Sequence, residues 1–211
     1  MDNYFETRFK EDYRRKFIWE QIAKYVDKID PGKKSVLEIG AGYCDWINAT
    51  KSPIRFASDI SDDVAKFALA PVKFIKMSAT NLEALNGQSF ERIQLSNLLE
   101  HLEYPDVLEA VREISSHLEK NGTVVIIQPN FRYSFKTYFD DYTHRTIFTH
   151  VSLCDLFSAS GFEVLKVEKR FLPFSLKSKL GMGYRLINLY LKLPIKLFAG
   201  QMLVVLRKTD S

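Results

Sequence analysis

Short apolar runs alternate with amphipathic stretches along most of the chain. Apolar residues that recur every three or four positions indicate helices, and short, continuous apolar runs indicate buried strands. The elements that this pattern predicts are helices over residues 11–29, 62–69, 105–118 and 184–193 and strands over residues 35–39, 54–58, 72–77, 91–95, 123–127, 162–167 and 202–206. Such alternation is typical of an α/β fold with a parallel sheet and right-handed crossovers.

Two stretches interrupt this alternation. Residues 130–149 are rich in aromatic and polar side chains and are too long for a plain connection, so we expect a functional loop there. Residues 171–200 form a long insertion between the last two strands, which we therefore expect to pair as an antiparallel edge. Asn121 is expected to close the helix before it, because asparagine tolerates the left-handed conformation of a helix C-terminus. His150 is expected to begin a further helix.

The composition fits a single folded domain over residues 1–211, with residues 1–33 as an N-terminal helical cap. The chain is 46% hydrophobic and 13% aromatic, which excludes a disordered chain. Its 2 cysteines exclude a disulfide framework and a four-thiolate zinc site. The first residues lack the pattern of a signal peptide, and no run of about 18 apolar residues occurs. We therefore expect a cytoplasmic protein.

Basic residues gather toward the end of the chain. Residues 166–211 contain 10 Lys/Arg and 2 Asp/Glu, a net charge of +8, so the remainder has a net charge of −4 within a total of +4. This asymmetry indicates an anionic partner such as a membrane surface, a phosphate-bearing substrate or a nucleic acid. A basic face that contacts only solvent is the alternative.

The strongest motif lies at the end of the first predicted strand, where the chain runs into Gly40 and Gly42 and then into a helix. Glycine permits backbone conformations that are closed to other residues and lets a ligand approach the main chain. Asp59 ends the second strand, and a carboxylate there can accept hydrogen bonds from both hydroxyls of a ribose. Together these residues predict a cofactor that contains adenosine, whereas two glycines alone would indicate an ordinary tight turn.

The identity of the cofactor depends on the neighbouring acids. A dinucleotide fingerprint requires a third glycine where this chain has Asp45, whose charge would face a pyrophosphate. Glu38, just before the glycines, instead suits a ligand with an ammonium group. S-adenosylmethionine has an amino acid end, a sulfonium and a ribose, and therefore matches this set of residues. Asp45 also argues against a dehydrogenase.

With these residues in place, residues 36–161 resemble the class I S-adenosylmethionine-dependent methyltransferases. The resemblance implies a Rossmann-like three-layer α/β/α sandwich with a seven-stranded sheet, six strands parallel and the last antiparallel. It also implies that S-adenosylmethionine is the cofactor and S-adenosylhomocysteine the product. The cofactor-binding residues that it implies are Glu38, Gly40, Ala41 and Gly42 at the methionine end, Asp59 at the ribose with Ile60 next to it, Ser78, Ala79 and Thr80 at the adenine, and Ser96 and Asn97 near the sulfonium. The sequence departs from the family at two positions, where Cys44 replaces the third glycine and Ser78 replaces a common aspartate.

The loop over residues 139–148 is the best candidate for substrate chemistry. The segment after the fourth strand lacks the motifs of adenine or amide N-methylation and of cytosine methylation, which leaves O-methylation or N-methylation of an amine. A hydroxyl nucleophile usually needs a base, and His144 is the first candidate because imidazole titrates near neutral pH. His101 is the second candidate, and Asp141 completes the catalytic set. Purely structural roles for both histidines are the alternative.

Other polar residues of this loop allow two further interpretations. Asp140, Asp141 and His144 could form a metal cluster, but no further acid is placed to complete it, so we expect no metal. Arg132 and Arg145 could bind a phosphate or carboxylate, or form ion pairs with Asp140 or Asp141.

A second resemblance concerns the acceptor. Several short motifs look like a bacterial subgroup of this family that is associated with surface polysaccharide and glycolipid assembly. They are residues 128–130, the spacing of Asp140 and His144, residues 171–174, residues 177–178 and residues 189–191. This resemblance implies a sugar hydroxyl of a nucleotide- or lipid-linked saccharide as the acceptor.

Several alternatives stay open for the function and the partners. They are a methyltransferase for a small metabolite or lipid, such as a quinone or fatty acid, and a non-catalytic partner protein that binds the cofactor or a membrane. The small charge excess argues against a nucleic acid substrate. Residues 171–200 could pack on the body, close over the substrate, join two subunits or contact the inner face of the membrane. A monomer and a dimer are both compatible with the sequence.

Overall fold

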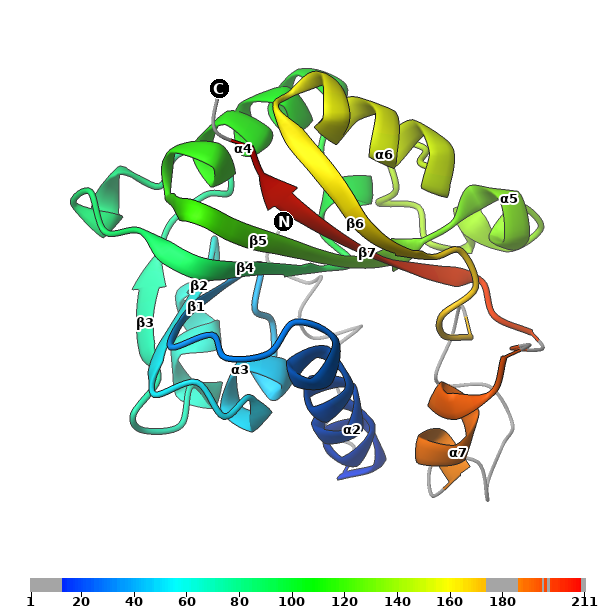
Figure 1. The fold of residues 1–211 in the computed structure, drawn as a ribbon, viewed down its shortest axis with the longest axis horizontal. Coiled ribbons are helices and arrows are strands. Elements are labelled where there is room, and N and C mark those ends of the chain that lie inside the picture. Colours follow the sequence, from blue (N-terminus) through cyan, green and yellow to red (C-terminus); the bar gives the residue numbers. More distant parts are fainter. Residues whose placement is uncertain (1–12, 174–185, 195, 197, 210–211) are drawn as a thin grey trace.

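The computed structural model describes residues 13–173, 186–194, 196 and 198–209 (Figure 1). The helices are α2 (Tyr13–Ile29), α3 (Asp45–Ala49), α4 (Tyr104–Ser116), α5 (Phe131–Ser134), α6 (His150–Ala159) and α7 (Ile187–Lys192), with short 3-10 helices η1 (Asp62–Phe67), η2 (Glu83–Leu85), η3 (Leu99–His101) and η4 (Tyr138–Asp140). The strands are β1 (Ser35–Ile39), β2 (Ile54–Asp59), β3 (Lys73–Lys76), β4 (Phe90–Ser96), β5 (Leu118–Pro129), β6 (Phe162–Glu168) and β7 (Gln201–Lys208).

The seven described strands form one sheet in the order β3-β2-β1-β4-β5-β7-β6. Strands β1 to β5 pair in parallel, and β7 runs antiparallel to both β5 and β6. The predicted α/β fold with six parallel strands and an antiparallel last strand is therefore confirmed. The strand order reverses between β1 and β4, and ligands of such sheets bind in the crevice beyond the carboxyl ends of the strands at this point.

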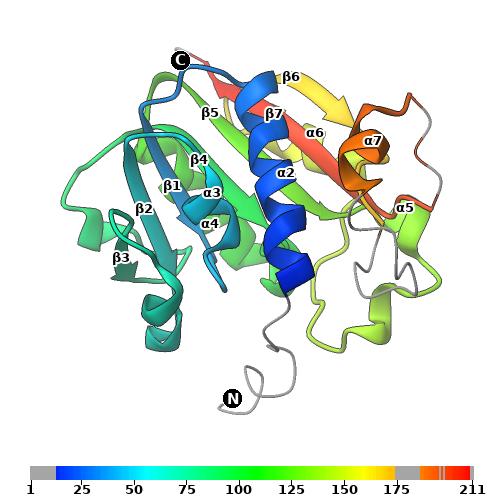
Figure 2. The same cartoon turned by 90° about the horizontal axis from the view of Figure 1, so that it is seen from below.

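Helices cover both faces of the sheet, with α4 and α6 on one face and α2, α3 and α7 on the other (Figures 1 and 2). In β5, Val124 and Ile126 belong to the core beneath α4 and α6, whereas Val125 and Ile127 belong to the core beneath α2 and α3. Burial on both faces explains why this strand is a continuous apolar run rather than an alternating one.

The structure corrects two expectations about these elements. Helix α4 already ends at Ser116, and Asn121, with a φ of 60°, lies within β5 instead of closing the helix. The strand takes over these residues because Leu118 pairs with Phe90 of β4. The last two strands form an antiparallel edge of the sheet as expected, with β6 outermost and β7 between β5 and β6, where its first six residues are all buried. Within residues 62–69, only Asp62–Phe67 are helical, and they form a 3-10 helix instead of the predicted longer helix.

The insertion before β7 is described only in part. Phe171 and Leu172 are buried in the core on the α2 side, and α7 contributes Ile187 and Leu191 to the same core. These residues therefore pack on the body, as one of the interpretations of the insertion requires. Residues 174–185 lie outside the described part of the chain, so the other interpretations stay predictions there. Within the described residues, no helix combines the length and apolar character needed to cross a bilayer.

Candidate functional site

A turn with two left-handed glycines follows β1 at the point where the strand order reverses. Gly40 has a φ of 70° and Gly42 a φ of 51°, values that glycine adopts at little cost. A Cβ atom on Gly40 would lie 2.9 Å from Cδ1 of Leu98, so the turn also needs glycine to let the chain after β4 approach. Cys44 has a φ of 55° without being a glycine, and its side chain is buried. The backbone thus keeps the left-handed conformation even where the sequence departs from glycine.

Glu38 lies beneath this turn as a buried carboxyl group. Its Oε2 accepts a hydrogen bond of 3.1 Å from the backbone N–H of Ile47, which fixes the start of α3 to β1. Burial raises the pKa of Glu38 well above its ordinary value. A positive charge placed nearby would favour the ionised form.

Asp59 joins the ends of three neighbouring strands. Its Oδ2 accepts a hydrogen bond of 3.0 Å from the N–H of Gly42, and its Oδ1 accepts one of 3.1 Å from the N–H of Ser61. The N–H of Met77, just after β3, donates to the backbone carbonyl of Asp59 at 3.1 Å. Ile60 follows with 73% of its surface exposed, so an apolar side chain lies open beside the carboxylate.

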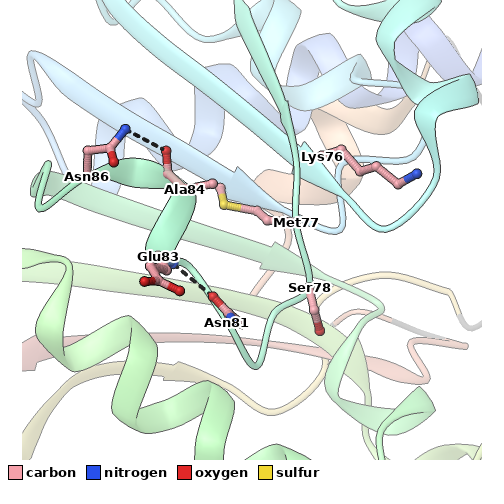
Figure 3. A pocket seen from close by; sticks show the side chains of 7 residues that line it. All are labelled: Lys76, Met77, Ser78, Asn81, Glu83, Ala84 and Asn86. Atoms are coloured by element: carbon pink, nitrogen blue, oxygen red, sulfur yellow. Dashed lines mark hydrogen bonds between the residues drawn. The ribbon is translucent and has the colours of Figure 1, made fainter.

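An open pocket lies just beyond β3 and follows the chain into η2 (Figure 3). Its lining residues are Lys76, Met77, Ser78, Asn81, Glu83, Ala84 and Asn86. The Ser78 hydroxyl lies 2.8 Å from the Thr80 hydroxyl, and Ala79 between them is buried. Of the three residues predicted to hold an adenine, Ser78 thus lines the pocket, and the hydrogen bond from Met77 to Asp59 keeps this loop next to Ile60.

Ser96 and Asn97 end β4 on the same edge of the sheet. The Ser96 hydroxyl accepts a hydrogen bond of 2.9 Å from the Gln94 amide. Asn97 has a φ of 51°, and its Oδ1 accepts a hydrogen bond of 3.2 Å from the side chain of Gln201 on β7. Leu98, which follows Asn97, packs directly on Gly40, so the segment after β4 lies against the turn after β1.

Arg15 of α2 belongs to this edge, although no pattern along the chain pointed to it. Its Nε lies 2.8 Å from Oδ2 of Asp45, and its guanidinium lies 3.9 Å from the centre of the Tyr43 ring. Burial lowers the pKa of Arg15, and the Asp45 carboxylate opposes that effect. The charge of Asp45 that argued against a dinucleotide is therefore offset by a residue 30 positions earlier in the chain.

A second polar cluster continues from the same segment after β4. Glu100, His101 and His144 each offer one nitrogen or oxygen atom, and these three atoms lie within 4.8 Å of one another. The imidazole rings of His101 and His144 meet edge to face, with centres 4.9 Å apart. The structure thus brings together the two histidines predicted as catalytic candidates, from the end of β4 and from the loop over residues 139–148.

Hydrogen bonds orient both imidazoles. Nδ1 of His144 lies 2.7 Å from the carbonyl oxygen of Tyr138 and must donate to it, since a carbonyl only accepts. Nδ1 of His101 lies 2.9 Å from the Thr143 hydroxyl, which donates its own proton to Oδ1 of Asp141 at 2.5 Å. Asp141 therefore acts on His101 through Thr143, and each imidazole carries its lone pair on Nε2.

Glu100 is the residue of this cluster that was not expected from the sequence. Its side chain is 1% exposed, and neither carboxyl oxygen has a hydrogen-bond partner of ordinary geometry among the described residues. Burial raises the pKa of Glu100 to about 8, against a smaller opposing effect of its own backbone N–H. The sequence offered one hint of its role: Glu100 precedes His101 in the segment after a predicted strand.

The remaining charged residues of the loop lie apart from this cluster. Asp140 and Arg132 are exposed, and Arg145 lies 3.8 Å from Glu103 rather than pairing with Asp140 or Asp141. Of the two alternatives for Arg145, the ion pair with Asp140 or Asp141 is therefore not the one that forms. The trio that forms is Glu100, His101 and His144, not the set of two aspartates and one histidine that the sequence suggested as a metal cluster.

Comparisons with known proteins agree on the fold. A family model described as "Methyltransferase domain" matches residues 9–167. A solved SAM-dependent methyltransferase from Archaeoglobus fulgidus has 23% identity and a TM-score of 0.67, with 93% of this chain and 98% of that chain covered. A possible histamine N-methyltransferase from Thermotoga maritima has 20% identity and a TM-score of 0.68, with coverage of 100% and 96%. The magnesium protoporphyrin IX methyltransferase of Synechocystis PCC 6803, solved with bound SAH, has 10% identity and a TM-score of 0.66, with coverage of 99% and 94%. No curated protein sequence matches significantly.

The close approach of Leu98 makes Gly40 sensitive to substitution. Gly40→Ala should lower the free energy of unfolding by about 1–2 kcal/mol for the left-handed backbone and by about 1–3 kcal/mol more for the contact with Leu98. Gly87→Ala is the matched control, because Gly87 has a similar φ of 78° and a Cβ added to it would have no atom within 4 Å. Urea denaturation measures both. Equal losses for the two variants would show that Leu98 does not constrain the turn.

Proposed function

The chain belongs to the methyltransferase domain family, and we propose that it transfers a methyl group from S-adenosylmethionine to a sugar hydroxyl of a glycan or glycolipid precursor. The observation that carries the cofactor assignment is the hydrogen bond between the N–H of Gly42 and Oδ2 of Asp59, which sets a carboxylate beside a glycine turn at the switch point of the sheet.

The residues at the switch point fit this cofactor. Gly40 and Gly42 leave the backbone open for the methionine end, with the buried Glu38 carboxyl beneath it. Each oxygen of Asp59 can accept a second hydrogen bond, which suits the two hydroxyls of a ribose. The exposed Ile60 offers an apolar contact for the face of an adenine, which would remove this side chain from water.

When bound, S-adenosylmethionine would supply a methyl group that an oxygen nucleophile attacks, with S-adenosylhomocysteine as the leaving group. The protein has to align the acceptor and exclude water, and alignment alone can account for much of the rate enhancement. We assign the polar end of the site to Glu100, His101 and His144. In an ion-free site, Nε2 of His144 accepts the proton of the acceptor hydroxyl, since Tyr138 fixes Nδ1 as the donor.

Two features support a saccharide on a lipid carrier. Phe135, Phe139 and Tyr142 are 56%, 59% and 72% exposed in and beside the loop that supplies His144, and such rings offer flat apolar surfaces to an acceptor. Leu189 of α7 and Phe198 after it are 59% and 89% exposed in the basic C-terminal part of the chain. Apolar side chains within a basic segment suit a peripheral contact with an anionic membrane that carries the acceptor.

The role of Asp59 gives a prediction for cofactor binding. Asp59→Ala should raise the dissociation constant for S-adenosylhomocysteine tenfold or more, because it removes a charged hydrogen-bond acceptor from the ribose. Asp63→Ala is the control, since the exposed Asp63 lies on neighbouring η1 and pairs only with the exposed Lys66 among the described residues. Calorimetric titration measures both variants. An unchanged constant for Asp59→Ala would remove Asp59 from the site.

The acceptor class is tested with methyl-labelled S-adenosylmethionine and purified acceptors. We expect label to pass to lipid-linked or nucleotide-linked saccharides and to be lost when their sugar hydroxyls are blocked. Label in a quinone or fatty acid, with none in any saccharide, would overturn the sugar assignment and leave the methyltransferase assignment intact.

The assignment of the base predicts the behaviour of His144→Ala. Turnover should fall by ~10²–10⁴, the usual contribution of a general base, while the affinity for S-adenosylhomocysteine stays within a factor of about three of the wild-type value. His117→Ala is the control, because His117 lies at the C-terminus of α4 with its Nδ1 2.9 Å from the Glu113 carbonyl oxygen. Initial rates of methyl transfer are measured at saturating cofactor. An unimpaired rate for His144→Ala would exclude His144 as the general base.

A further inference from the structure

The cluster of Glu100, His101 and His144 has a chemistry that proton transfer alone does not require. The carboxyl group of Glu100, the imidazole of the next residue and the imidazole of His144 from a later loop each offer one donor atom to a common space. We propose that these three residues form a binding site for one divalent transition-metal ion. This inference does not depend on the identity of the methyl acceptor, and it replaces the expectation of a site without metal.

The Glu100 carboxyl is the first argument for an ion. A buried carboxyl group normally accepts several hydrogen bonds, because its desolvation is costly when it has no partner. Glu100 is 1% exposed, and both of its oxygens lack such a partner among the described residues. A cation bound in this space would satisfy both the charge and the lone pairs of Glu100.

The orientation of the imidazoles is the second argument. Metal-binding histidines usually donate their other ring N–H to a carbonyl or carboxylate, which fixes the ring and raises the basicity of the ligating nitrogen. His144 donates from Nδ1 to the Tyr138 carbonyl at 2.7 Å. His101 donates from Nδ1 to Thr143, which in turn donates to the Asp141 carboxylate. Both histidines thus have the outer contacts of ligands that bind through Nε2.

The spacing of the three donor atoms allows coordination after a small contraction. Bonds of about 2.1 Å place neighbouring ligand atoms of a tetrahedral ion roughly 3.4 Å apart, whereas these atoms lie within 4.8 Å of one another. His101 is only partly buried and can move toward the two buried ligands, Glu100 and His144. A side-chain movement of about 1 Å is small compared with the rearrangement that a new loop conformation would need.

The donor set defines the class of ion. Imidazole nitrogens favour zinc, iron, copper or nickel, whereas magnesium and calcium prefer oxygen ligands. Three protein ligands also leave at least one position open, as in catalytic rather than structural metal sites. An ion at this place would lower the pKa of a hydroxyl bound to it, so that in the ion-loaded protein His144 acts as a ligand and not as the base.

The test uses the full chain, freed of metal with a chelator and then titrated with Co²⁺ and Zn²⁺ in the absence of any cofactor. We expect one ion per chain, with the visible absorption bands of Co²⁺ bound by nitrogen and oxygen. Glu100→Gln and His101→Ala should each lower the affinity tenfold or more. Thr143→Val should lower it about 10-fold to 100-fold, because it removes the outer contact of His101.

Two control variants keep the outcome interpretable. Asp140→Asn and His117→Ala remove an acid of the same loop and a histidine of α4, and both should bind the ions as the wild-type chain does. Circular dichroism identifies a variant that fails to fold, and His101→Ala, at a partly exposed position, then replaces Glu100→Gln. The proposal would be overturned if the wild-type chain bound the ions no more tightly than folded Glu100→Gln or His101→Ala. It would also be overturned if the two control variants lost as much affinity for the ions as these variants do.

Discussion

The close approach of two strand ends at the centre of the sheet determines the rest of this site. Strands β1 and β4 are neighbours at the point where the strand order reverses, and the chain after β4 brings Leu98 onto the turn after β1. A side chain at Gly40 would have to displace Leu98, because a Cβ atom there would lie 2.9 Å from the Cδ1 atom of Leu98. The positive φ of Gly40 would strain such a residue as well. The turn therefore presents bare backbone at the one place where the sheet topology opens a crevice.

The same segment after β4 connects the two halves of the site. Leu98 contacts the glycine turn, and Glu100 and His101 follow it at once in η3, where they meet His144 from the loop after α5. The proposed cofactor side and the proposed acceptor side thus share one short stretch of chain. This arrangement would bring a methyl donor and the polar cluster together without a second domain. It also ties the position of the cluster to the packing at the glycine turn.

Much of this could be predicted from the sequence because the signals are local. The apolar runs predicted all seven described strands, and burial on both faces explains those of the central strands β1, β4, β5 and β7. Asp59 ends a strand, and the glycines and the segment after β4 each follow one directly. The position of β7 between β5 and β6 could not be predicted from local patterns, because the pairing of β7 with β5 depends on contacts between residues about 80 positions apart. Asn121 was misassigned because its left-handed conformation suits a strand irregularity as well as a helix end.

The polar residues were harder to predict for the same reason. Glu100 gains its character from burial and from His144, 44 positions later, and Arg15 reaches Asp45 only because α2 packs beside α3. Neither relation leaves a pattern along the chain. His101 and His144 could be chosen from their chemistry, but their mutual contact and their outer hydrogen bonds required the structure.

The proposed activity depends above all on a cofactor at the glycine turn, and calorimetric titration of the wild-type chain addresses that binding without any acceptor. S-adenosylhomocysteine and S-adenosylmethionine are titrated separately, with NAD as the comparison ligand. We expect micromolar binding of both sulfur ligands with one site per chain and no measurable binding of NAD. Absence of binding by either sulfur ligand would refute the cofactor assignment and would leave the chain as a methyltransferase fold that has lost its cofactor, with Cys44 and Ser78 as the first residues to restore.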